Sequence, residues 1–537
     1  MLRPALLLVL LGLAFPAPAG ARPDAAAPAA TLPPVTSTTF LVSGRGWGHG
    51  VGMSQYGALA LANDGAGYEE ILTHYYTGVT LGPAPVARVR VLVAEAKAAV
   101  TVSSTAAFRV RDAFGAAHQL EPGAVRLDRT LRVTANGAPT QLTGPLVFLP
   151  GAAPLAVDRT PYRGQVRVAV AAGKLDAIND VGLEQYLFGV VPREMPAAWP
   201  AEALKAQAVA ARSYALAHRL TGRPYDLYAD VRSQVYGGLR GEDPRATAAI
   251  TATAGQVMLH EGRIVNALFH STSGGRTVSS AEVFGGTVPY LAGVDDPGSA
   301  ISPVHRWGPV PVTDVAVRKG LRLGTPVRAL RLVKAPSGRV ASAVVRTTVG
   351  QRTVRGTELR SALGLRSTWI TALTTLSLTR PGGPVLHGTN VTLTASAPRA
   401  KNVVLAQRVD GTWRQLAARP AGGAFSAEVK LTAPATFRLT AGRSGGPLLR
   451  VPVAPRVTVA RAEGALEGAV VPPETARVVQ LQRLAGTTWT SVPDAVATVG
   501  EGGRYRVEGA LEPGSYRVRV APAGGYAQGL SGVVRIP

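Results

Sequence analysis

The sequence predicts a multidomain protein: a strand-rich α+β domain with a few helices, followed by two all-β sandwiches. Three observations favour this organisation. The chain has 537 residues, which is too long for a single hydrophobic core. Hydrophobic residues make up 46% and charged residues 17%, as is typical of globular domains. Apolar residues recur at helical spacing near residue 200, whereas residues 376–537 contain only short alternating segments separated by turn residues.

The first 37 residues predict an export signal followed by a linker. A basic start at Arg3 precedes an apolar run that ends at Phe15, and the small-x-small tripeptide at 19–21 fits a signal-peptidase site. Because the run is well short of the roughly 20 residues that span a bilayer, we predict a signal peptide over residues 1–21 and contact with the membrane only during export. Residues 22–37 are rich in Pro and Ala, which indicates a linker. We therefore expect a secreted protein of the cell envelope, in the periplasm or the cell wall.

The sequence contains no cysteine and carries a formal net charge of +24. The lack of cysteine excludes disulfides, thiolate nucleophiles, cysteine-ligated zinc and a lipid anchor on cysteine. The basic charge favours anionic partners, but the charges are scattered and no nucleic-acid-binding motif occurs. We predict no nucleic-acid partner and expect anionic wall polymers instead, with a compositional bias toward Arg as an equally good account of the charge.

Residues 38–375 are predicted to form the α+β domain. A Gly-rich block with a helical middle occupies residues 38–81, and alternating apolar and polar residues predict strands over residues 84–180. A short helix is expected over residues 183–190, and a longer helix is expected to start at Pro200. Its buried face is marked by apolar residues at helical spacing, namely Leu204, Ala208, Ala211 and Ala215.

Residues 376–537 contain an internal repeat. It is carried by three pairs of segments: residues 403–408 and 478–483, Trp413 and Trp489, and residues 437–439 and 516–518. A spacing of about 75–79 residues suits a small β-sandwich. We therefore predict two immunoglobulin-like domains, at residues 376–455 and 456–537. Both tryptophans are expected in the hydrophobic cores, with carbohydrate stacking as the alternative.

Glu194 lies in a predicted tight turn between Pro192 and Pro196, each of which fixes φ and restricts the residue before it. Its other sequence neighbours are mostly apolar, namely Val190, Val191, Met195 and Trp199. Burial among such groups would raise the pKa of the carboxyl and keep it protonated near neutral pH, and glycosidic cleavage needs such an acid. The alternative is a structural glutamate that pairs with Arg193 or caps the helix at Pro200.

A second polar cluster, residues 269–277, follows the apolar segment 264–268, which we expect to be a strand. Adjacent residues of a strand point to opposite faces, so His270 and Ser271 are poor partners for nucleophilic catalysis. Hydrogen bonding to sugar hydroxyls is the functional interpretation of this cluster. A polar turn that satisfies its own backbone is the structural one.

A third block, residues 44–57, contains six glycines, which allow the backbone to approach a ligand or another segment closely. The phosphate-binding pattern G-x-x-x-x-G-K-[ST] is absent. Trp47 and Tyr56 could stack on sugar rings, while His49 and Gln55 could form hydrogen bonds. The block therefore indicates a binding site, with tight packing against another segment as the alternative.

Four groups of motifs together resemble the stage II sporulation protein D family, also called SpoIID/LytB. They are YLFGVVPREMPAAWPAEALKAQAVAARSYAL (residues 186–216), SQVYGG (233–238), FHSTSGG with SAEVFGG and PYLAGVDDP (within 269–297), and GRGWGHGVGMSQYGA (44–58). The resemblance covers about residues 38–370. It makes residues 38–375 a SpoIID/LytB-like domain.

Characterised members of this family are similar to lytic transglycosylases, which cleave between N-acetylmuramic acid and N-acetylglucosamine and leave an anhydro-muramic end. The resemblance implies this activity here, with peptidoglycan glycan strands as the substrate and Glu194 in the position of the family's catalytic glutamate. It also implies a set of side chains that lines or braces the groove: Arg212, Tyr214, Gln234, Tyr236, His270, Ser271, Ser273, His49, Gln55 and Tyr56. The alternative implied by the LytB name is a non-catalytic glycan-binding protein that enhances a cell-wall amidase.

An ordinary glycosidase uses two carboxylates that flank the bond. The resemblance implies that one is enough here, since the substrate's own hydroxyl replaces water. Glu194 has no carboxylate partner in its motif. Candidates from elsewhere in the chain are Glu184, Glu282, Asp295 and Asp296.

This chain departs from the family pattern in two ways. Some members bind zinc through cysteine, and the chain has none; His49, His270 and His305 lack a metal-ligand spacing, so we predict neither a metal nor a cofactor. The Gly-rich block also stands at the front instead of after the Leu-Arg-Ser-Thr segment that ends at Thr368, which resembles a circular permutation. Such an order predicts that residues 38–57 pack beside residues 360–370.

Overall fold

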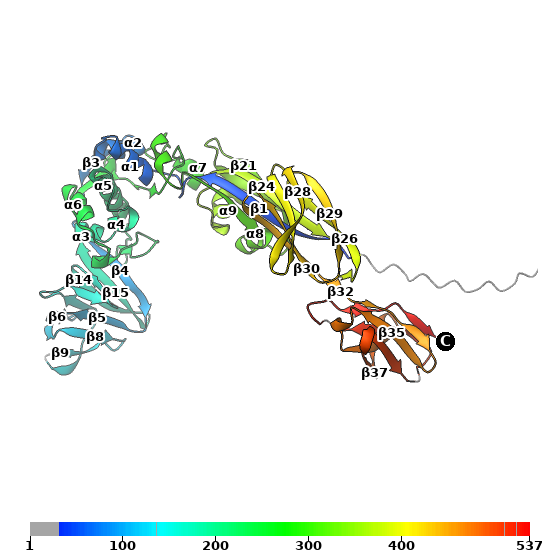
Figure 1. Ribbon diagram of the computed structural model, residues 1–537. Coiled ribbons are helices and arrows are strands. Elements are labelled where there is room, and N and C mark those ends of the chain that lie inside the picture. Colours follow the sequence, from blue (N-terminus) through cyan, green and yellow to red (C-terminus); the bar gives the residue numbers. More distant parts are fainter. Residues whose placement is uncertain (1–31, 136, 510, 522) are drawn as a thin grey trace, which may run out of the picture. The chain divides into compact units, whose positions relative to one another are not determined.

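The computed structural model describes residues 32–537 apart from residues 136, 510 and 522. The predicted signal peptide and residues 22–31 of the predicted linker lie outside the described residues. The chain forms two compact units (Figure 1). In the described part, the first unit comprises residues 38–376 and 443–446, and the second comprises residues 32–37, 377–442 and 447–537. Strand β1 (Val35–Arg45) begins inside the predicted linker.

The strand-rich part of the first unit lies between residues 88 and 182. Its largest sheet has the order β16-β4-β15-β14-β11-β6-β7, with bounds Leu227–Tyr228, Arg88–Lys97, Lys174–Gly182, Gln165–Ala171, Leu146–Leu149, Phe108–Arg111 and Ala117–Leu120. A four-stranded sheet has the order β13-β12-β5-β8, with bounds Thr160–Tyr162, Leu155–Val157, Val100–Ser104 and Gly123–Leu127, and β9 (Arg132–Ala135) pairs with β10 (Ala138–Gln141). Alternate residues of both sheets share one hydrophobic core, for example Val89, Val100 and Phe148.

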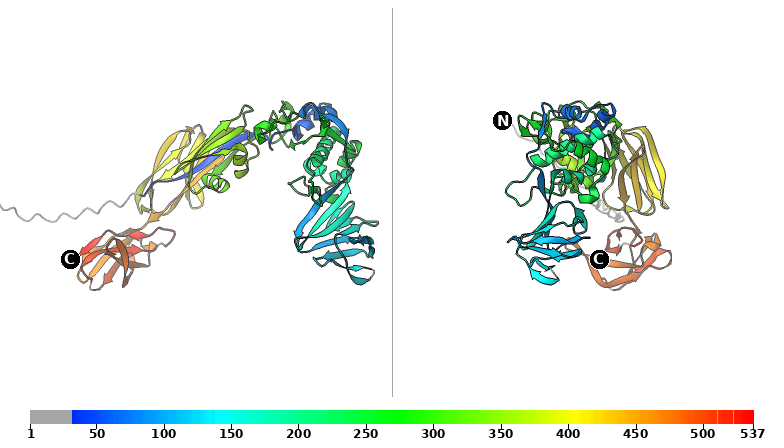
Figure 2. Two further views of the ribbon diagram at one scale, coloured as in Figure 1. Left: turned by 180° about the vertical axis from the view of Figure 1, so that it is seen from behind. Right: turned by 90° about the vertical axis from the view of Figure 1, so that its left-hand side faces the viewer.

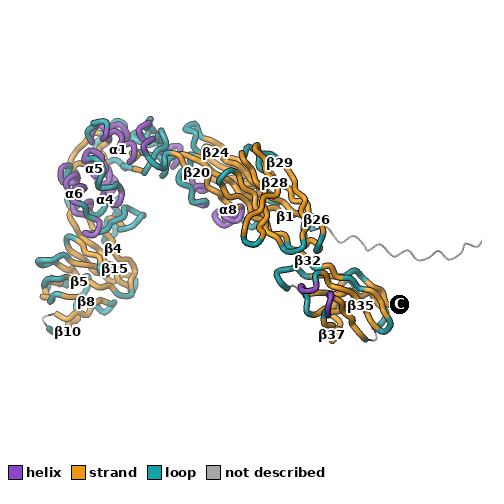
Figure 3. The backbone as a smooth tube through the Cα atoms, in the orientation of Figure 1, coloured by secondary structure: helices purple, strands orange, loops and turns teal. Residues whose placement is uncertain are grey.

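Five helices of the first unit pack around α5 (Ala201–Ala217), among the purple segments of Figure 3. They are α1 (Gln55–Asn63), α2 (Tyr68–Tyr75), α3 (Leu183–Phe188), α4 (Val191–Glu194) and α6 (Pro244–Ala252), with the 3-10 turn Gly238–Gly241. The predicted apolar face of α5 is buried in full, and Pro200 is its N-cap residue. The sheet β18-β17-β3 (Arg263–Ile264, Gln256–His260 and Thr80–Pro83) packs beside it.

The predicted strand at residues 264–268 is wrong. Only Ile264 lies in a strand, β18, and regular pairing resumes at β19 (Phe269–His270), which runs parallel to β2 (Met53–Ser54). The reason is that the intervening backbone bonds to other segments: the carbonyl of Leu268 accepts hydrogen bonds from Met53 N and from the Tyr76 hydroxyl. Helix α7 (Ser280–Phe284) and a 3-10 turn (Pro297–Ile301) follow.

The remainder of the first unit is formed by both ends of its sequence. Strand β1 pairs with β20 (Arg306–Thr313), followed by α8 (Asp314–Leu321), the sheet β21-β22-β23 (Val327–Lys334, Val340–Thr347 and Gln351–Arg355) and α9 (Gly356–Ala362). Two backbone bonds join the front block to residues near 368: Arg45 N donates to Trp369 O at 2.9 Å, and Gly48 N donates to Arg366 O at 2.9 Å. These bonds bring residues 38–57 beside residues 360–370, as the permuted order of the segments predicts.

The second unit contains two β-sandwiches (Figure 2). In residues 377–454, strand β24 (Ile370–Arg380) pairs through its last residues with β26 (Thr389–Ser396), which pairs with β29 (Ala424–Leu431); the other sheet has the order β28-β27-β30-β31, with bounds Thr412–Ala421, Lys401–Val409, Ala435–Ala441 and Ser444–Val451. Short strands β25 (Val385–Leu386) and β32 (Val453–Ala454) pair in parallel.

Residues 456–537 form the second sandwich. One sheet contains β33 (Arg456–Val457), β34 (Ala460–Ala462), β35 (Ala465–Val471) and β38 (Arg504–Glu508). The other contains β37 (Thr488–Thr498), β36 (Val478–Ala485), β39 (Gly514–Val520), β40 (Gly529–Leu530) and β41 (Val534–Ile536). The two units together confirm the predicted fold class. No helix among the described residues is long and apolar enough to cross a membrane.

The prediction that both repeat tryptophans lie in the cores is wrong. Trp413 and Trp489 are half-buried, and each indole lies against an arginine on the surface of its sheet, Arg438 at 4.2 Å and Arg517 at 4.4 Å from the ring centroid. The cores are filled instead by strand residues that alternate with these positions, such as Phe437. Trp413 and Trp489 therefore occupy matching positions in the internal repeat, although neither is a core residue.

Candidate functional site

Glu194 is the last residue of α4, a single helical turn where a non-helical turn was predicted. Pro192 stands in the first turn of this helix, where a missing N–H costs nothing, and Pro196 disfavours helical geometry at the residue before it. Val191 and Met195 are buried, while the Glu194 side chain is half-buried. The short helix thus holds the carboxyl at the edge of a hydrophobic cluster.

Burial raises the pKa of Glu194 above its ordinary value. Among the described residues, no side chain forms a salt bridge or hydrogen bond with its carboxyl. Arg193 makes no ion pair with it, and α5 has no side-chain cap at Pro200. Among the described residues, neither structural role considered for this glutamate is therefore seen.

Two phenols lie close enough to Glu194 to sense its charge. Burial, followed by the charges of neighbours that include Glu194, raises the pKa of Tyr186 and of Tyr214, so both remain protonated donors. The Tyr186 hydroxyl donates to Gln234 Oε1 at 3.2 Å, which leaves the Gln234 amide nitrogen buried without a partner among the described residues. Tyr236 packs on Tyr186 with ring centroids 5.0 Å apart.

The Gly-rich block reaches this site through the start of α1. Gln55 Nε2 donates to the backbone carbonyl of Glu194 at 3.0 Å and to Gln207 Oε1 at 3.2 Å. The ring of Tyr56 meets Trp199 edge-on, with centroids 4.9 Å apart. The structure therefore brings together four predicted site residues, Glu194, Tyr214, Gln55 and Tyr56. In the sequence, Gln55 and Glu194 are 139 residues apart.

Gln207, Tyr186 and Trp199 belong to this cluster but were not predicted as site residues. Gln207 is fully buried on α5, and its amide nitrogen has no partner among the described residues. The sequence did hold a signal, because a glutamine stands on the helix face otherwise marked by Leu204 and Ala211. A polar residue in such a stripe needs a polar neighbour from elsewhere in the fold.

His49 and His270 form a separate pair, with ring centroids 5.4 Å apart. His49 Nδ1 accepts a hydrogen bond from Val51 N, and His270 Nδ1 lies 3.2 Å from the Val51 carbonyl. Burial, then the charge of Arg360, lowers the pKa of His49 to about 4, and burial lowers the pKa of His270 well below its ordinary value. Within the described residues, no hydrogen bond or ring contact joins either histidine to Glu194.

The glycines of the block serve close packing against residues 268–273. Gly48 has φ +119°, and a Cβ there would lie 2.6 Å from the His270 Cβ. Gly52 has φ +70°, and a Cβ there would lie 1.9 Å from the Leu268 carbonyl oxygen. Of the two roles proposed for these glycines, approach to another segment is the one that this geometry explains.

Three other predicted residues differ in their exposure. Arg212 is completely buried and forms a bidentate ion pair with Glu184, so it can brace the site but cannot touch a substrate. Ser273 is also buried, and its hydroxyl donates to Asp296 Oδ2 at 2.5 Å. Ser271 is half-buried, beside the Thr272 hydroxyl at 3.3 Å.

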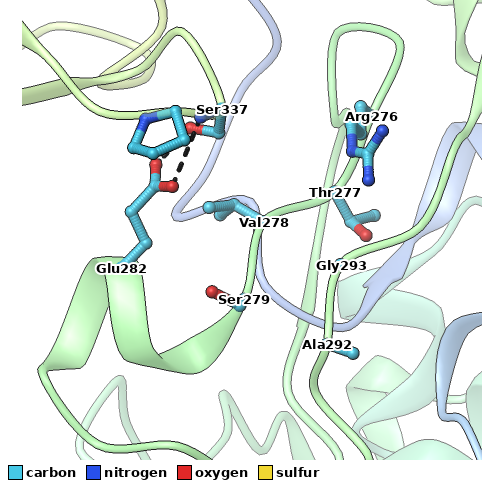
Figure 4. Close-up of a pocket in the computed structure, with 9 residues that line it drawn as sticks. Arg276, Thr277, Val278, Ser279, Glu282, Ala292, Gly293 and Ser337 are labelled. Atoms are coloured by element: carbon cyan, nitrogen blue, oxygen red, sulfur yellow. Dashed lines mark hydrogen bonds between the residues drawn. The ribbon is translucent and has the colours of Figure 1, made fainter.

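None of the candidate partner carboxylates contacts Glu194. Glu282 accepts hydrogen bonds from Ser337 at a pocket that Arg276 also lines and that does not include Glu194 (Figure 4). Asp295 pairs with Arg276 on the surface. Burial raises the pKa of Asp296, which accepts bonds from Ser273 and from Tyr75. Glu194 is thus a single unpartnered carboxyl.

The described residues contain no group of three His, Asp or Glu side chains that could hold a metal ion. His305 lies apart from the His49–His270 pair, and its ring carbon is 3.8 Å from the Cβ position of Gly275. Among the described residues, the side chains gathered near Glu194 are phenols, amides and an indole.

Comparison with known proteins finds a family model that matches the segment around Glu194. Residues 171–260, which include α3, α4 and α5, match the SpoIID family model, described as stage II sporulation protein. An amidase enhancer of Bacillus subtilis is 41% identical over 111 residues, which are 20% of this chain and 15% of that protein. The predicted resemblance to the stage II sporulation protein D family is confirmed.

Two further relatives extend the match. A stage II sporulation protein D of Bacillus subtilis is 27% identical over 213 residues, 36% of this chain and 60% of that protein. An uncharacterized protein of Brachyspira hyodysenteriae is 37% identical over 136 residues, 25% of this chain and 37% of that protein. The chain spans less than two thirds of the length of each of these three relatives.

Proposed function

We propose that this protein is an exported peptidoglycan-remodelling enzyme, a lytic transglycosylase that uses Glu194 alone as acid and base. The observation that carries the proposal is a half-buried carboxyl with a raised pKa and no ion partner among the described residues. A protonated carboxyl near neutral pH is the general acid that a glycosidic oxygen requires. The names of the relatives, an amidase enhancer and a stage II sporulation protein, favour a place in the cell envelope.

In this mechanism Glu194 acts twice. It first donates its proton to the glycosidic oxygen while the bond from that oxygen to C1 of N-acetylmuramic acid breaks. A hydroxyl of the same sugar then attacks C1, and its proton returns to the Glu194 carboxylate. The product is an internal anhydro ring, no water is consumed, and the acid is restored, so a second carboxylate is not needed.

The surrounding side chains are assigned to binding. Tyr56 and Trp199 offer aromatic surface for a sugar ring, and Tyr214 offers a hydrogen-bond donor, whereas Gln234 is buried and braces Tyr186. Gln55 holds the backbone of Glu194. In this proposal Arg212 and Ser273 support the fold of the site instead of touching the glycan.

A second candidate is an amidase enhancer that binds glycan without cutting it. The similarity to the amidase enhancer of Bacillus subtilis favours it, because that match has the highest identity of the three relatives. In that case a cell-wall amidase is the partner, and Glu194 acts only as a hydrogen-bonding group.

The test is digestion of purified, peptide-stripped glycan strands, with mass spectrometry of the products. The enzyme predicts anhydro-muramic ends from the wild type and none from Glu194→Gln. Glu70→Gln, at an exposed glutamate of α2, is the matched control and should cut normally. Intact strands that still bind the wild type would overturn the enzyme and support the enhancer, whereas ordinary reducing ends would show hydrolysis.

A further inference from the structure

The two sandwiches of the second unit carry the same surface feature, a tryptophan stacked against an arginine. Trp413 on β28 lies against Arg438 on β30, and Trp489 on β37 lies against Arg517 on β39. In each sheet a central strand, β27 or β36, separates the two partners. Each indole must therefore cross the middle strand to reach its arginine, so both rings lie along the sheet surface.

The strand register shows that the two pairs occupy equivalent places. Arg438 is opposite Ala406, and Arg517 is opposite Gln482, while Trp413 and Trp489 are opposite Arg408 and Leu484, each two residues further along the same central strand. The core residues keep the same correspondence, since Leu405 and Leu481 are both fully buried. The pair is thus a conserved element of the internal repeat at a surface position, where packing of the core does not demand it.

A stacked guanidinium keeps its chemistry available at its edge. The face of the Arg group lies on the indole, but its N–H donors lie in its own plane and remain able to bind a carboxylate or phosphate in bidentate fashion. Arg438 Nε is buried and has no hydrogen-bond partner among the described residues, so contact with a ligand falls to its terminal nitrogens. Arg517 Nε is already held, since it donates to Gln482 Oε1 at 2.9 Å, which leaves its terminal nitrogens.

The charge around the two pairs is mostly positive, although β37 of the second sandwich carries Asp494 and Arg483 pairs with Glu512. The four strands of the sheet β28-β27-β30-β31 contain six Lys and Arg residues and no Asp or Glu. On the second sandwich Arg519 lies two residues from Arg517 on the same face. Burial and the charge of Arg519 both lower the pKa of Arg517, as expected for like charges without a counter-ion.

We propose that these two Trp–Arg surfaces bind an anionic polysaccharide, with the indole against sugar rings and the arginines on carboxylate or phosphate groups. The protein would then attach to acidic envelope polymers through residues 377–537, independently of any cleavage at Glu194. Two equal sites on one chain would act together on a long polymer and raise the overall affinity.

The test measures binding of the full mature chain to sodium alginate, a polyuronate, to a phosphomannan, whose sugars carry phosphate, and to neutral dextran. We expect both polyanions to bind and dextran not to bind. The double variant Arg438→Gln, Arg517→Gln should raise Kd by about tenfold or more, because charge-assisted bidentate contacts at both sites are lost. Binding of only one polyanion would identify carboxylate or phosphate as the group recognised.

The matched control is Lys430→Gln, Arg504→Gln, which removes the same charge from exposed positions on the opposite sheet of each sandwich. We expect it to change Kd by less than about twofold. An equal loss in both double variants would overturn the proposal, because net charge alone would then explain binding. Failure of the wild type to bind either polyanion, or equal binding to dextran, would overturn it as well. Since the readout is binding, neither result bears on Glu194.

Discussion

The surroundings of Glu194 and the segment 269–277 are both polar regions singled out by sequence, yet the fold uses them differently. At Glu194 it leaves one carboxyl half-buried and unpaired, beside the protonated phenol of Tyr214. In segment 269–277 it buries Ser273 against Asp296 and His270 against Val51. A sequence motif rich in polar residues can therefore mark either a functional site or a packed structural segment. The two cases differ in whether the polar side chains are satisfied by partners within the fold.

The largest effect that would sharpen this comparison is expected from Glu194→Gln. Glycan cleavage should fall by about a thousandfold, the range of a lost general acid, while the midpoint of thermal unfolding should hardly change, because the amide replaces a carboxyl that has no ion partner. Cleavage rates and calorimetry on the same sample measure both. A large loss of stability would instead place Glu194 among the structural residues.

A large loss of stability is expected for Glu184→Gln. This change leaves the fully buried Arg212 without its counter-charge, and we expect unfolding to become easier by about 3 kcal/mol. Denaturant titration measures this difference. Asp295→Asn, which breaks the exposed pair with Arg276, is the control and should cost no more than about 1 kcal/mol; equal costs would contradict the bracing role of Arg212.

A smaller loss is expected in the second region. Ser273→Ala removes a buried hydroxyl that donates to Asp296 and should lower the free energy of unfolding by about 1–2 kcal/mol. Ser271→Ala, at a half-buried position, should cost less. If Ser273→Ala left stability intact but reduced glycan binding, segment 269–277 would belong to the site after all.

The last prediction is a dependence of stability on pH. The folded pKa of His49 is about 4, below the ordinary value of 6.5, so the unfolded chain binds the proton more readily. The contribution of His49 is therefore fully present above pH 6.5 and is lost as the pH falls toward 4. Thermal unfolding of His49→Gln should be less sensitive to pH in this window, and an unchanged slope would contradict the assignment.

How far the sequence predicts this molecule depends on the range of the interactions. The setting of Glu194 was predictable because Pro192, Pro196 and the apolar neighbours are local. Gln207 and Tyr186 could not be placed in the site by spacing, because α1, α3 and α5 meet only in the folded unit. The sequence also did not reveal that Arg212 is fully buried and paired with Glu184, because the two residues are 28 positions apart in the chain.

The two C-terminal sandwiches show the same limit. The repeat was visible in the sequence, but aligning residues 403–408 with 478–483 is one residue out of the structural register, which pairs Leu405 with Leu481. A shift of one residue exchanges the two faces of a strand. The wrong core assignment of Trp413 and Trp489 has another cause, because these two residues are matched in the structural register, opposite Arg408 and Leu484.

The most direct test of the central claim is a titration of the Glu194 carboxyl itself. Infrared difference spectra of the wild type against Glu194→Gln isolate its protonated C=O band as the pH is changed. The account predicts a midpoint above the ordinary value for glutamate, with glycan cleavage declining as the pH rises through it, because the protonated form is the acid. A midpoint at or below the ordinary value, or cleavage that ignores this titration, would contradict the account.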